Sequence, residues 1–183
     1  MKIYCDGSRV GLNGEGKIEG AVIGWSGVAE NGALIAKGAR QGGSNVNAEM
    51  LAIRDTLTNF IAYRRAWVNQ MLQEEDVELV VVTDSKTSIQ ITEGYLKAPQ
   101  TYDLNESENY RIADQISKKV KQLSDLGLTV KFKHMRGHGR GEVPAEPLDL
   151  LGNAFADYVA DQASNELYVK VLESRSERSQ PPF

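Results

Sequence analysis

The chain has 183 residues, 41% hydrophobic and 25% charged, with a formal net charge of −4 and a pI near 5.3. This length predicts one domain with a substantial core, and no apolar run approaches the roughly 20 residues that a membrane span requires. An N-terminus without the apolar region of a secretory signal and a single cysteine, Cys5, predict a reducing, cytoplasmic location without a membrane partner. A monomer is the default expectation.

The first part of the chain predicts an antiparallel meander followed by a helix. A short strand at residues 2–5 precedes a strand rich in Val and Ile at residues 21–29. The dipeptide Asn31-Gly32 is a strong signal for a two-residue hairpin turn, so residues 33–39 return as the next strand. From residue 47 to residue 73, apolar residues recur at spacings of three and four, which predicts a long amphipathic helix.

The second part alternates strands and helices. A buried strand at residues 79–82 leads to a short helix at residues 85–95, and a second helix contains an apolar face over residues 113–123. Residues 128–134 form a further strand. After a loop rich in glycine and proline, a last helix is expected at residues 152–167. This order predicts an α/β fold in which helices cover a mixed sheet.

Acids follow two of the predicted strands. Asp6 comes directly after the first strand, and Asp84 follows the strand at residues 79–82 by one residue. In such sheets, functional sites form at the carboxyl ends of neighbouring strands. If the first and fourth strands are adjacent and parallel, these two carboxylates meet at one edge of the sheet.

Four carboxylates are candidates for a common site, although each has a simpler structural explanation. Asp6 could form an Asp-Gly turn, and Asp84 could cap the helix after it. Glu49 suits the first turn of a helix, and Asp157 could face solvent. If the four converge instead, cations must lie between the mutually repelling groups, and oxygen ligands suit Mg²⁺. Two such ions about 4 Å apart would activate a water and stabilise a leaving oxygen in phosphodiester hydrolysis.

The charge of the chain is unevenly distributed. An acidic net charge argues against a nucleic-acid partner, but between residues 117 and 141 only Asp125 opposes seven basic residues. These are Lys118, Lys119, Lys121, Lys131, Lys133, Arg136 and Arg140. A nucleic-acid-binding surface and a solvated basic helix face both produce this pattern.

Five short segments resemble, in the same order, the motifs of the ribonuclease H type 1 family. They are IYCDGS at residues 3–8, NAEMLA at 47–52, VTDS at 82–85, RGHG at 136–139 and GNAFAD at 152–157. Each motif is weak alone, but the ordered set on a matching pattern of elements is specific. The resemblance implies a five-stranded mixed sheet with strand order 3-2-1-4-5 flanked by helices. It places this catalytic domain at residues 1–167, and we expect residues 168–183 to form a disordered tail.

The same resemblance implies an activity and its catalytic residues. The family hydrolyses the RNA strand of RNA–DNA hybrids with two Mg²⁺ ions, which Mn²⁺ can replace, and leaves 5′-phosphate and 3′-hydroxyl ends. Its metal-binding acids match Asp6, Glu49, Asp84 and Asp157. His138, between two glycines, matches a mobile loop histidine to which proton transfer or product release is attributed; a plain surface histidine is the alternative. His134, inside a predicted strand, is expected to be structural.

Substrate contacts are also inferred by analogy. A groove that reads 2′-hydroxyl groups across a minor groove can distinguish RNA from DNA. Short polar side chains and backbone groups would do this here, and the metal ligand Glu49 would also contact a 2′-hydroxyl, whereas Lys86 could contact a phosphate or simply face solvent. The expected substrate-binding residues are Gly7, Ser8, Asn13, Asn45, Lys86 and Asn153. Most of the affinity would come from phosphate contacts and would fall steeply with salt.

The chain departs from the family pattern in three places. Val46 interrupts the pair of asparagines that often precedes the glutamate, and residues 97–111 lack the basic helical extension of some bacterial members. The loop from residue 138 to residue 153 is longer than expected. Its acids, Glu142, Glu146 and Asp149, either contact the metals or face solvent.

Other functions are possible on the same fold. A proofreading-type exonuclease usually carries a second acid at the position of Ser8, and a resolvase or transposase core would lack the glycine-flanked histidine. A non-catalytic module that binds nucleic acid or protein is an alternative of a different class. The presence of all four acids argues against it, and a cleavage assay discriminates between the two.

Overall fold

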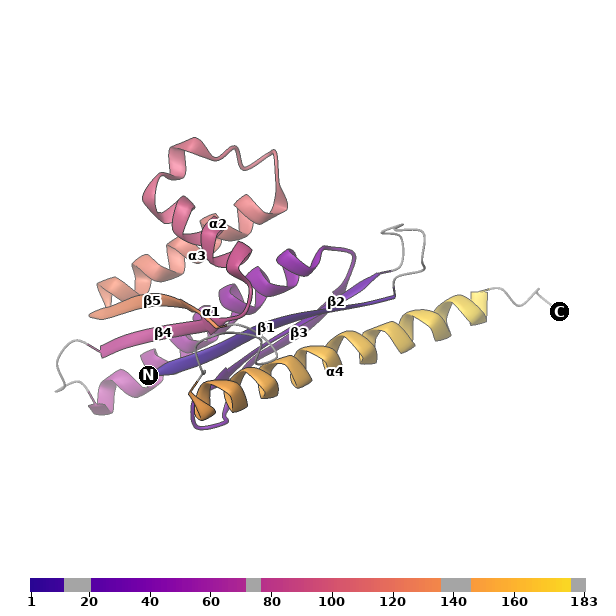
Figure 1. Ribbon diagram of the computed structural model, residues 1–183, viewed down its shortest axis with the longest axis horizontal. Coiled ribbons are helices and arrows are strands. Elements are labelled where there is room, and N and C mark those ends of the chain that lie inside the picture. Colours follow the sequence, from indigo (N-terminus) through magenta and orange to yellow (C-terminus); the bar gives the residue numbers. More distant parts are fainter. Residues whose placement is uncertain (12–20, 72–76, 136–145, 179–183) are drawn as a thin grey trace.

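Five strands form one mixed sheet in the computed structural model, which describes residues 1–11, 21–71, 77–135 and 146–178 (Figure 1). The strand order is β3-β2-β1-β4-β5, which confirms the order implied by the resemblance. The strands are β1 (Lys2–Val10), β2 (Val22–Ala29), β3 (Leu34–Gln41), β4 (Val77–Thr83) and β5 (Leu128–His134).

The pairing of the strands changes from antiparallel to parallel at β1. β1, β2 and β3 form the antiparallel meander, and Gly32 adopts a positive φ of 81° in the predicted hairpin turn. β4 is parallel to β1 and to β5. The contact between β1 and β4 is short: it joins Lys2–Tyr4 to Val80–Val82 and goes no further along β1.

Helices cover both faces of the sheet (Figure 1). α1 and α3 pack on one face, and α4 lies along the other, against β1, β2 and β3. The helices are α1 (Asn45–Met71), α2 (Lys86–Lys97), the short 3₁₀ helix η1 (Pro99–Thr101), α3 (Glu108–Asp125) and α4 (Pro147–Arg178). Among the described residues, no helix combines the length and the apolar character needed to cross a membrane.

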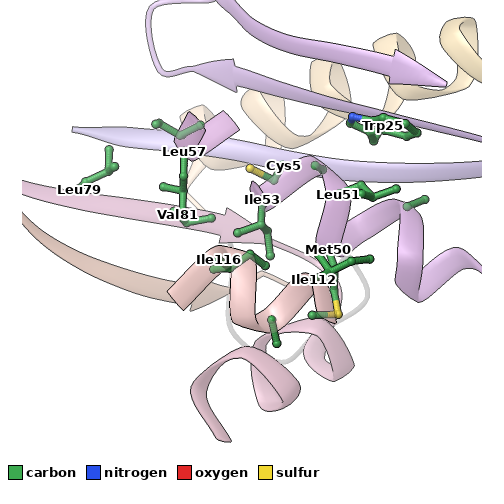
Figure 2. Close-up of a cluster of buried hydrophobic side chains, with 14 of the residues drawn as sticks. Cys5, Trp25, Met50, Leu51, Ile53, Leu57, Leu79, Val81, Ile112 and Ile116 are labelled. Carbon is green, nitrogen blue, oxygen red and sulfur yellow. The ribbon is translucent and has the colours of Figure 1, made fainter. Parts of the chain in front are cut away.

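The main core lies between the sheet and the helices α1 and α3. Figure 2 shows Leu79 and Val81 from β4 facing Ile53 of α1 and Ile116 of α3. Because successive strand residues point to opposite faces, Val82 belongs instead to a smaller apolar cluster beneath α4. β4 is therefore apolar on both faces, as its sequence LVVV predicted, and its end is held firmly between two layers.

Three predicted boundaries, in two elements, are wrong. β1 continues to Val10 instead of ending at Cys5, because it pairs with β2 along its whole length. α4 begins at Pro147, since proline is well tolerated in the first turn of a helix, and it continues beyond the expected end at residue 167 to Arg178. No glycine or proline occurs between residues 153 and 180 to stop it. The expected disorder is therefore wrong for residues 168–178, and residues 179–183 lie outside the described part of the chain.

Candidate metal centre

The register between β1 and β4 brings two acids side by side. Tyr4 pairs with Val82, and Asp6 and Asp84 each lie two residues further along the chain. β4 ends at Thr83, so Asp6 lies inside β1 at the point where its neighbour on that side has ended. Asp6 is thus within a strand, not after one, but the predicted meeting of the two acids at one edge is found.

Asp84 does not cap the helix that follows it. The N-cap of α2 is Ser85, whose hydroxyl accepts a hydrogen bond from the backbone N–H of Ser88 at 3.3 Å. From β5, Nε2 of His134 lies 3.0 Å from the backbone carbonyl oxygen of Asp84. His134 therefore contacts the backbone of the turn, in line with the structural role expected for it, and the Asp84 carboxylate is left to face Asp6.

Hydrogen bonds between Ser44 and Asn47 fix the first turn of α1 just before Glu49. The backbone N–H of Ser44 donates to Oδ1 of Asn47 at 2.8 Å, and the Asn47 N–H donates to the Ser44 hydroxyl at 3.1 Å. This reciprocal cap satisfies two backbone donors at the start of the helix. The Asn47 amide also donates to Oδ1 of Asn109 in α3 at 2.6 Å. Sequence reasoning missed Asn47, although the spacing of Ser44 and Asn47 resembles a capping box.

Gly7 allows α1 to approach the sheet closely enough to bring Glu49 to Asp6. A Cβ atom at Gly7 would lie 2.4 Å from the backbone nitrogen of Glu49, a separation that real Cβ atoms do not show. The Thr83 hydroxyl donates to Oε2 of Glu49 at 3.2 Å, and the Gly7 N–H donates to Oδ1 of Asp6 at 2.7 Å. The glycine predicted to contact substrate therefore also has a packing role.

Asp6, Glu49 and Asp84 form one cluster. Each offers a carboxylate oxygen, and the three oxygens lie within 4.8 Å of one another. Burial, followed by the charges of Asp84 and Asp157, raises the pKa of Asp6 from 3.8 to about 8. Burial and then the charges of Asp6 and Asp84 raise the pKa of Glu49 well above its usual value. Crowded, desolvated carboxylates favour their neutral form unless a cation balances them, and an all-oxygen donor set suits Mg²⁺ better than zinc.

Asp157 approaches this cluster from the opposite face of the sheet. It lies on α4, is half-buried, and its charge contributes to the raised pKa of Asp6. One residue earlier, the backbone carbonyl of Ala156 accepts a hydrogen bond from the Ser26 hydroxyl at 2.6 Å, which holds this turn of α4 against β2. One turn earlier, Asn153 is buried, and among the described atoms its Oδ1 has no hydrogen-bond partner.

Asp149 has neither of the two roles expected for it. It is 1% exposed and its carboxylate accepts hydrogen bonds from Tyr4 at 2.9 Å, Lys2 at 2.9 Å and Lys133 at 2.7 Å. Burial acts to raise the pKa of Asp149, but the bonds from Lys133, Lys2 and Tyr4 outweigh it and lower the pKa to about 2. Glu146 pairs with Lys2 at 2.7 Å at the surface. These contacts anchor the first turn of α4 to β1 and β5. Glu142 lies outside the described residues.

Five of the six expected substrate-binding residues lie in the described part of the chain, each within four residues of one of the four acids along the sequence. Gly7 and Ser8 follow Asp6 in β1, and the Ser8 hydroxyl donates to Oδ1 of Asp161 in α4. The other described members are at helix starts or on α4: Asn45 is the first residue of α1, Lys86 is the first residue of α2, and Asn153 lies one turn before Asp157. Asn13 and His138 lie outside the described residues, so their expected roles stay predictions.

The basic segment is largely paired where it can be described. Lys118 forms an ion pair with Asp114, Lys131 with Glu78 and Lys133 with Asp149. Lys119 and Lys121 lie on α3, whereas Arg136 and Arg140 fall outside the described residues. Much of the local excess of positive charge is therefore used within the fold, which weakens the case for a nucleic-acid-binding surface on charge alone.

Comparison with known proteins agrees with this geometry. The family model described as RNase H matches residues 1–165. No curated protein matches the sequence.

Solved structures share the fold at low sequence identity. LC11-RNase H1, isolated from compost by a metagenomic approach, is 20% identical with a TM-score of 0.54, covering 91% of this chain and 96% of its own. The RNase H domain of prototype foamy virus is 16% identical with a TM-score of 0.56, covering 90% and 94%. The foamy viral protease–reverse transcriptase in complex with RNA/DNA hybrid is 13% identical with a TM-score of 0.55, covering 90% of this chain and 20% of its own.

Proposed function

This chain belongs to the RNase H family, and from that premise we propose that it is an endonuclease that hydrolyses the RNA strand of RNA–DNA hybrids. The observation that carries the proposal is the cluster of Asp6, Glu49 and Asp84, whose oxygens lie within 4.8 Å of one another beside the carboxyl end of β4. Hydrolysis would leave 5′-phosphate and 3′-hydroxyl ends. A similar domain occurs in the foamy viral protein that was solved with an RNA/DNA hybrid.

Divalent cations are part of this proposal. Asp6, Glu49 and Asp84 would hold two Mg²⁺ ions, or Mn²⁺ in their place, and Asp157 would complete the set from α4. Bound in this way, the ions supply an activated water and stabilise the leaving oxygen. The raised pKa values of Asp6 and Glu49 support this assignment, because a bound cation would offset the burial and the mutual repulsion that cause both shifts.

The protein groups orient the ligands and the substrate. Thr83 holds Oε2 of Glu49 and the Gly7 N–H holds Oδ1 of Asp6, so each carboxylate presents a defined oxygen to the site. His138 would transfer a proton or assist product release. Asn45 and Lys86, which are exposed at the starts of α1 and α2, would contact a 2′-hydroxyl and a phosphate.

A cytoplasmic location is also part of the proposal. Burial raises the pKa of the Cys5 thiol to about 12, so this cysteine is an unreactive core residue. A protein whose single thiol is inert and buried is compatible with a reducing compartment.

A cleavage assay with an end-labelled hybrid tests the activity directly. We expect cleavage of the RNA strand with Mg²⁺, none with EDTA, and little cleavage of duplex DNA or duplex RNA. Binding of the hybrid without cleavage under any divalent cation would support the non-catalytic module instead. Degradation of duplex DNA from its ends would support an exonuclease.

Asp84→Asn tests the metal role. The substitution keeps the size of the side chain and removes one negative charge from the cluster, so we expect kcat to fall at least about 10³-fold while hybrid binding stays nearly intact. Asp125→Asn, an exposed change of the same kind at the end of α3, is the matched control and should leave kcat unchanged. Near-normal turnover by Asp84→Asn would contradict the assignment.

A further inference from the structure

The outward face of α4 is apolar although it packs against nothing in the described fold. α4 has 32 residues, and one face of it covers the sheet through small buried side chains such as Ala156, Ala160 and Ala163. The opposite face carries exposed apolar residues whose relative exposure lies between 41% and 68%. They are Leu148, Leu151, Phe155, Tyr158, Val169 and Leu172. Together with exposed Gln162 and Asn165 they form the outer seam of α4.

The outer seam follows a heptad pattern. Its eight positions from Leu148 to Leu172 are separated alternately by three and four residues, which is the a/d spacing of a coiled coil. A helix that only covers a sheet needs one apolar stripe, with polar residues on the other side. A second stripe with a/d spacing, opposite the first, therefore indicates a second helix packed on the outside. Figure 1 shows α4 along the outside of the sheet, and within the described part of the chain no other helix lies over it.

Between Phe155 and Leu172 the order of residues in the outer seam is self-complementary, whereas Leu148 and Leu151 lie outside this pairing. Two apolar blocks flank a central polar pair, Gln162 and Asn165. If a second α4 runs antiparallel about the midpoint of this pair, Phe155 meets Leu172 and Tyr158 meets Val169 of the second copy. A polar residue at a core position of a coiled coil specifies register, and here Gln162 would meet Asn165 of the second copy at the centre.

We propose that the outer seam is a homodimer interface in which two copies of α4 pack antiparallel. The occupant is a second copy because the seam complements itself in this register. Nucleic acid does not fit, since exposed acids, Asp161, Glu166 and Glu173, border the seam. This replaces the monomer that was the default expectation from the sequence.

The length of the seam sets the strength of the dimer. From Leu148 to Leu172 it extends over ~36 Å at 1.5 Å per residue, and a strip about 10 Å wide buries roughly 400 Å² on each chain. The total of about 800 Å² is below the 1,200–2,000 Å² of stable complexes. We therefore expect a reversible dimer with a Kd on the order of 1 to 100 μM.

Sedimentation equilibrium of the full chain between about 1 and 300 μM tests the dimer. We expect the mass to rise from that of a monomer to that of a dimer as the concentration increases. Leu172→Glu should raise the Kd at least about 100-fold, because the two-fold axis places the new charge in the seam twice. Leu96→Glu is the matched control, since Leu96 is 37% exposed on α2, which packs against α3, and it should leave the Kd unchanged. A monomer throughout this range would overturn the proposal, as would a dimer unaffected by Leu172→Glu.

Cysteine crosslinking tests the register, since the native Cys5 is buried. Tyr158→Cys mixed with Val169→Cys should form an oxidised heterodimer, whereas each variant alone should not crosslink, because equal positions are ~16 Å apart along the antiparallel axis. Efficient self-crosslinking of Tyr158→Cys would indicate a parallel seam and would overturn the antiparallel arrangement. Circular dichroism and hybrid cleavage by Leu172→Glu show that its fold and its active site are intact.

Discussion

Replacing Asp149 by asparagine should destabilise the fold without touching the metal centre. The carboxylate of Asp149 is 1% exposed and accepts three hydrogen bonds, from Tyr4, Lys2 and Lys133. Asparagine has nearly the same volume, so packing is kept, but its amide nitrogen would direct N–H donors towards the ammonium group of either Lys2 or Lys133. The change therefore isolates the electrostatic contribution of this buried carboxylate.

The expected loss follows from the lowered pKa. A fall in the pKa of Asp149 from 3.8 to about 2 corresponds to roughly 2 kcal/mol at neutral pH, at about 1.4 kcal/mol per unit. The side chains of Lys2 and Lys133 are 27% and 44% exposed, so water screens part of their attraction to Asp149. The expected loss is therefore smaller than the loss from breaking a fully buried ion pair. For a domain of this size, a loss of about 2 kcal/mol lowers Tm by roughly 4–8 °C.

Urea unfolding followed by circular dichroism measures this loss and its pH dependence. Because the pKa is lowered in the folded state, the stabilisation is present above the unfolded value near 4 and is lost as the pH falls towards 2. The free energy of unfolding of Asp149→Asn should therefore be about 2 kcal/mol lower than that of the wild type at pH 7. This difference should become smaller at pH 3. Glu146→Gln, an exposed neighbour in the same set of contacts, should lower the free energy of unfolding clearly less than Asp149→Asn. A difference within 0.5 kcal/mol of wild type for Asp149→Asn at pH 7, measured as ΔG of unfolding, would refute the reasoning.

Two further predictions concern the metal centre. The raised pKa values of Asp6 and Glu49 mean that the folded chain retains protons that the unfolded chain releases. The free energy of unfolding of the metal-free protein should therefore fall as the pH rises from about 4 to 8. In a thermal unfolding experiment, Mg²⁺ should raise Tm more at pH 8 than at pH 5. An equal rise of Tm at both pH values would argue against Mg²⁺ binding at these acids. Gly7→Ala should displace α1, because its Cβ would lie 2.4 Å from the nitrogen of Glu49, and we expect kcat/KM to fall at least about 10-fold. Gly38→Ala crowds the Trp25 ring at 2.5 Å instead and should lower Tm while leaving kcat/KM unchanged; equal kcat/KM values for the two variants would show that Gly7 does not position the site.

Much of the fold could be predicted because its signals are local. The Asn31-Gly32 turn, the apolar run before Asp84 and the three-and-four spacing of α1 are each contained in a short window of sequence. The approach of Asp6 to Asp84 needed one additional assumption, that β1 and β4 are parallel neighbours, and the register confirms it. The strand order itself came from the family resemblance.

The features that could not be predicted depend on contacts between distant parts of the chain. Asp149 and its partner Lys2 are 147 residues apart, so no local pattern distinguishes this buried carboxylate from a solvated one. The extension of β1 beyond Cys5 depends on pairing with β2. Gly7 and Gly11 made this segment resemble a loop in the sequence. The heptad spacing on the outer face of α4 was present in the sequence, but only the structure shows which of the two apolar faces of that helix covers the sheet.

The two helices that supply acids are both fixed to the sheet upstream of those acids. In α1, the reciprocal cap at Asn47 and its bond to Asn109 come just before Glu49. In α4, the buried Asp149 comes two turns before Asp157. Mutually repelling carboxylates would otherwise separate in the absence of cations, so contacts that do not involve the acids must hold the helices in place. The three acids are thereby held together by the fold itself, so under the proposed function their carboxylates would need little rearrangement to bind a cation.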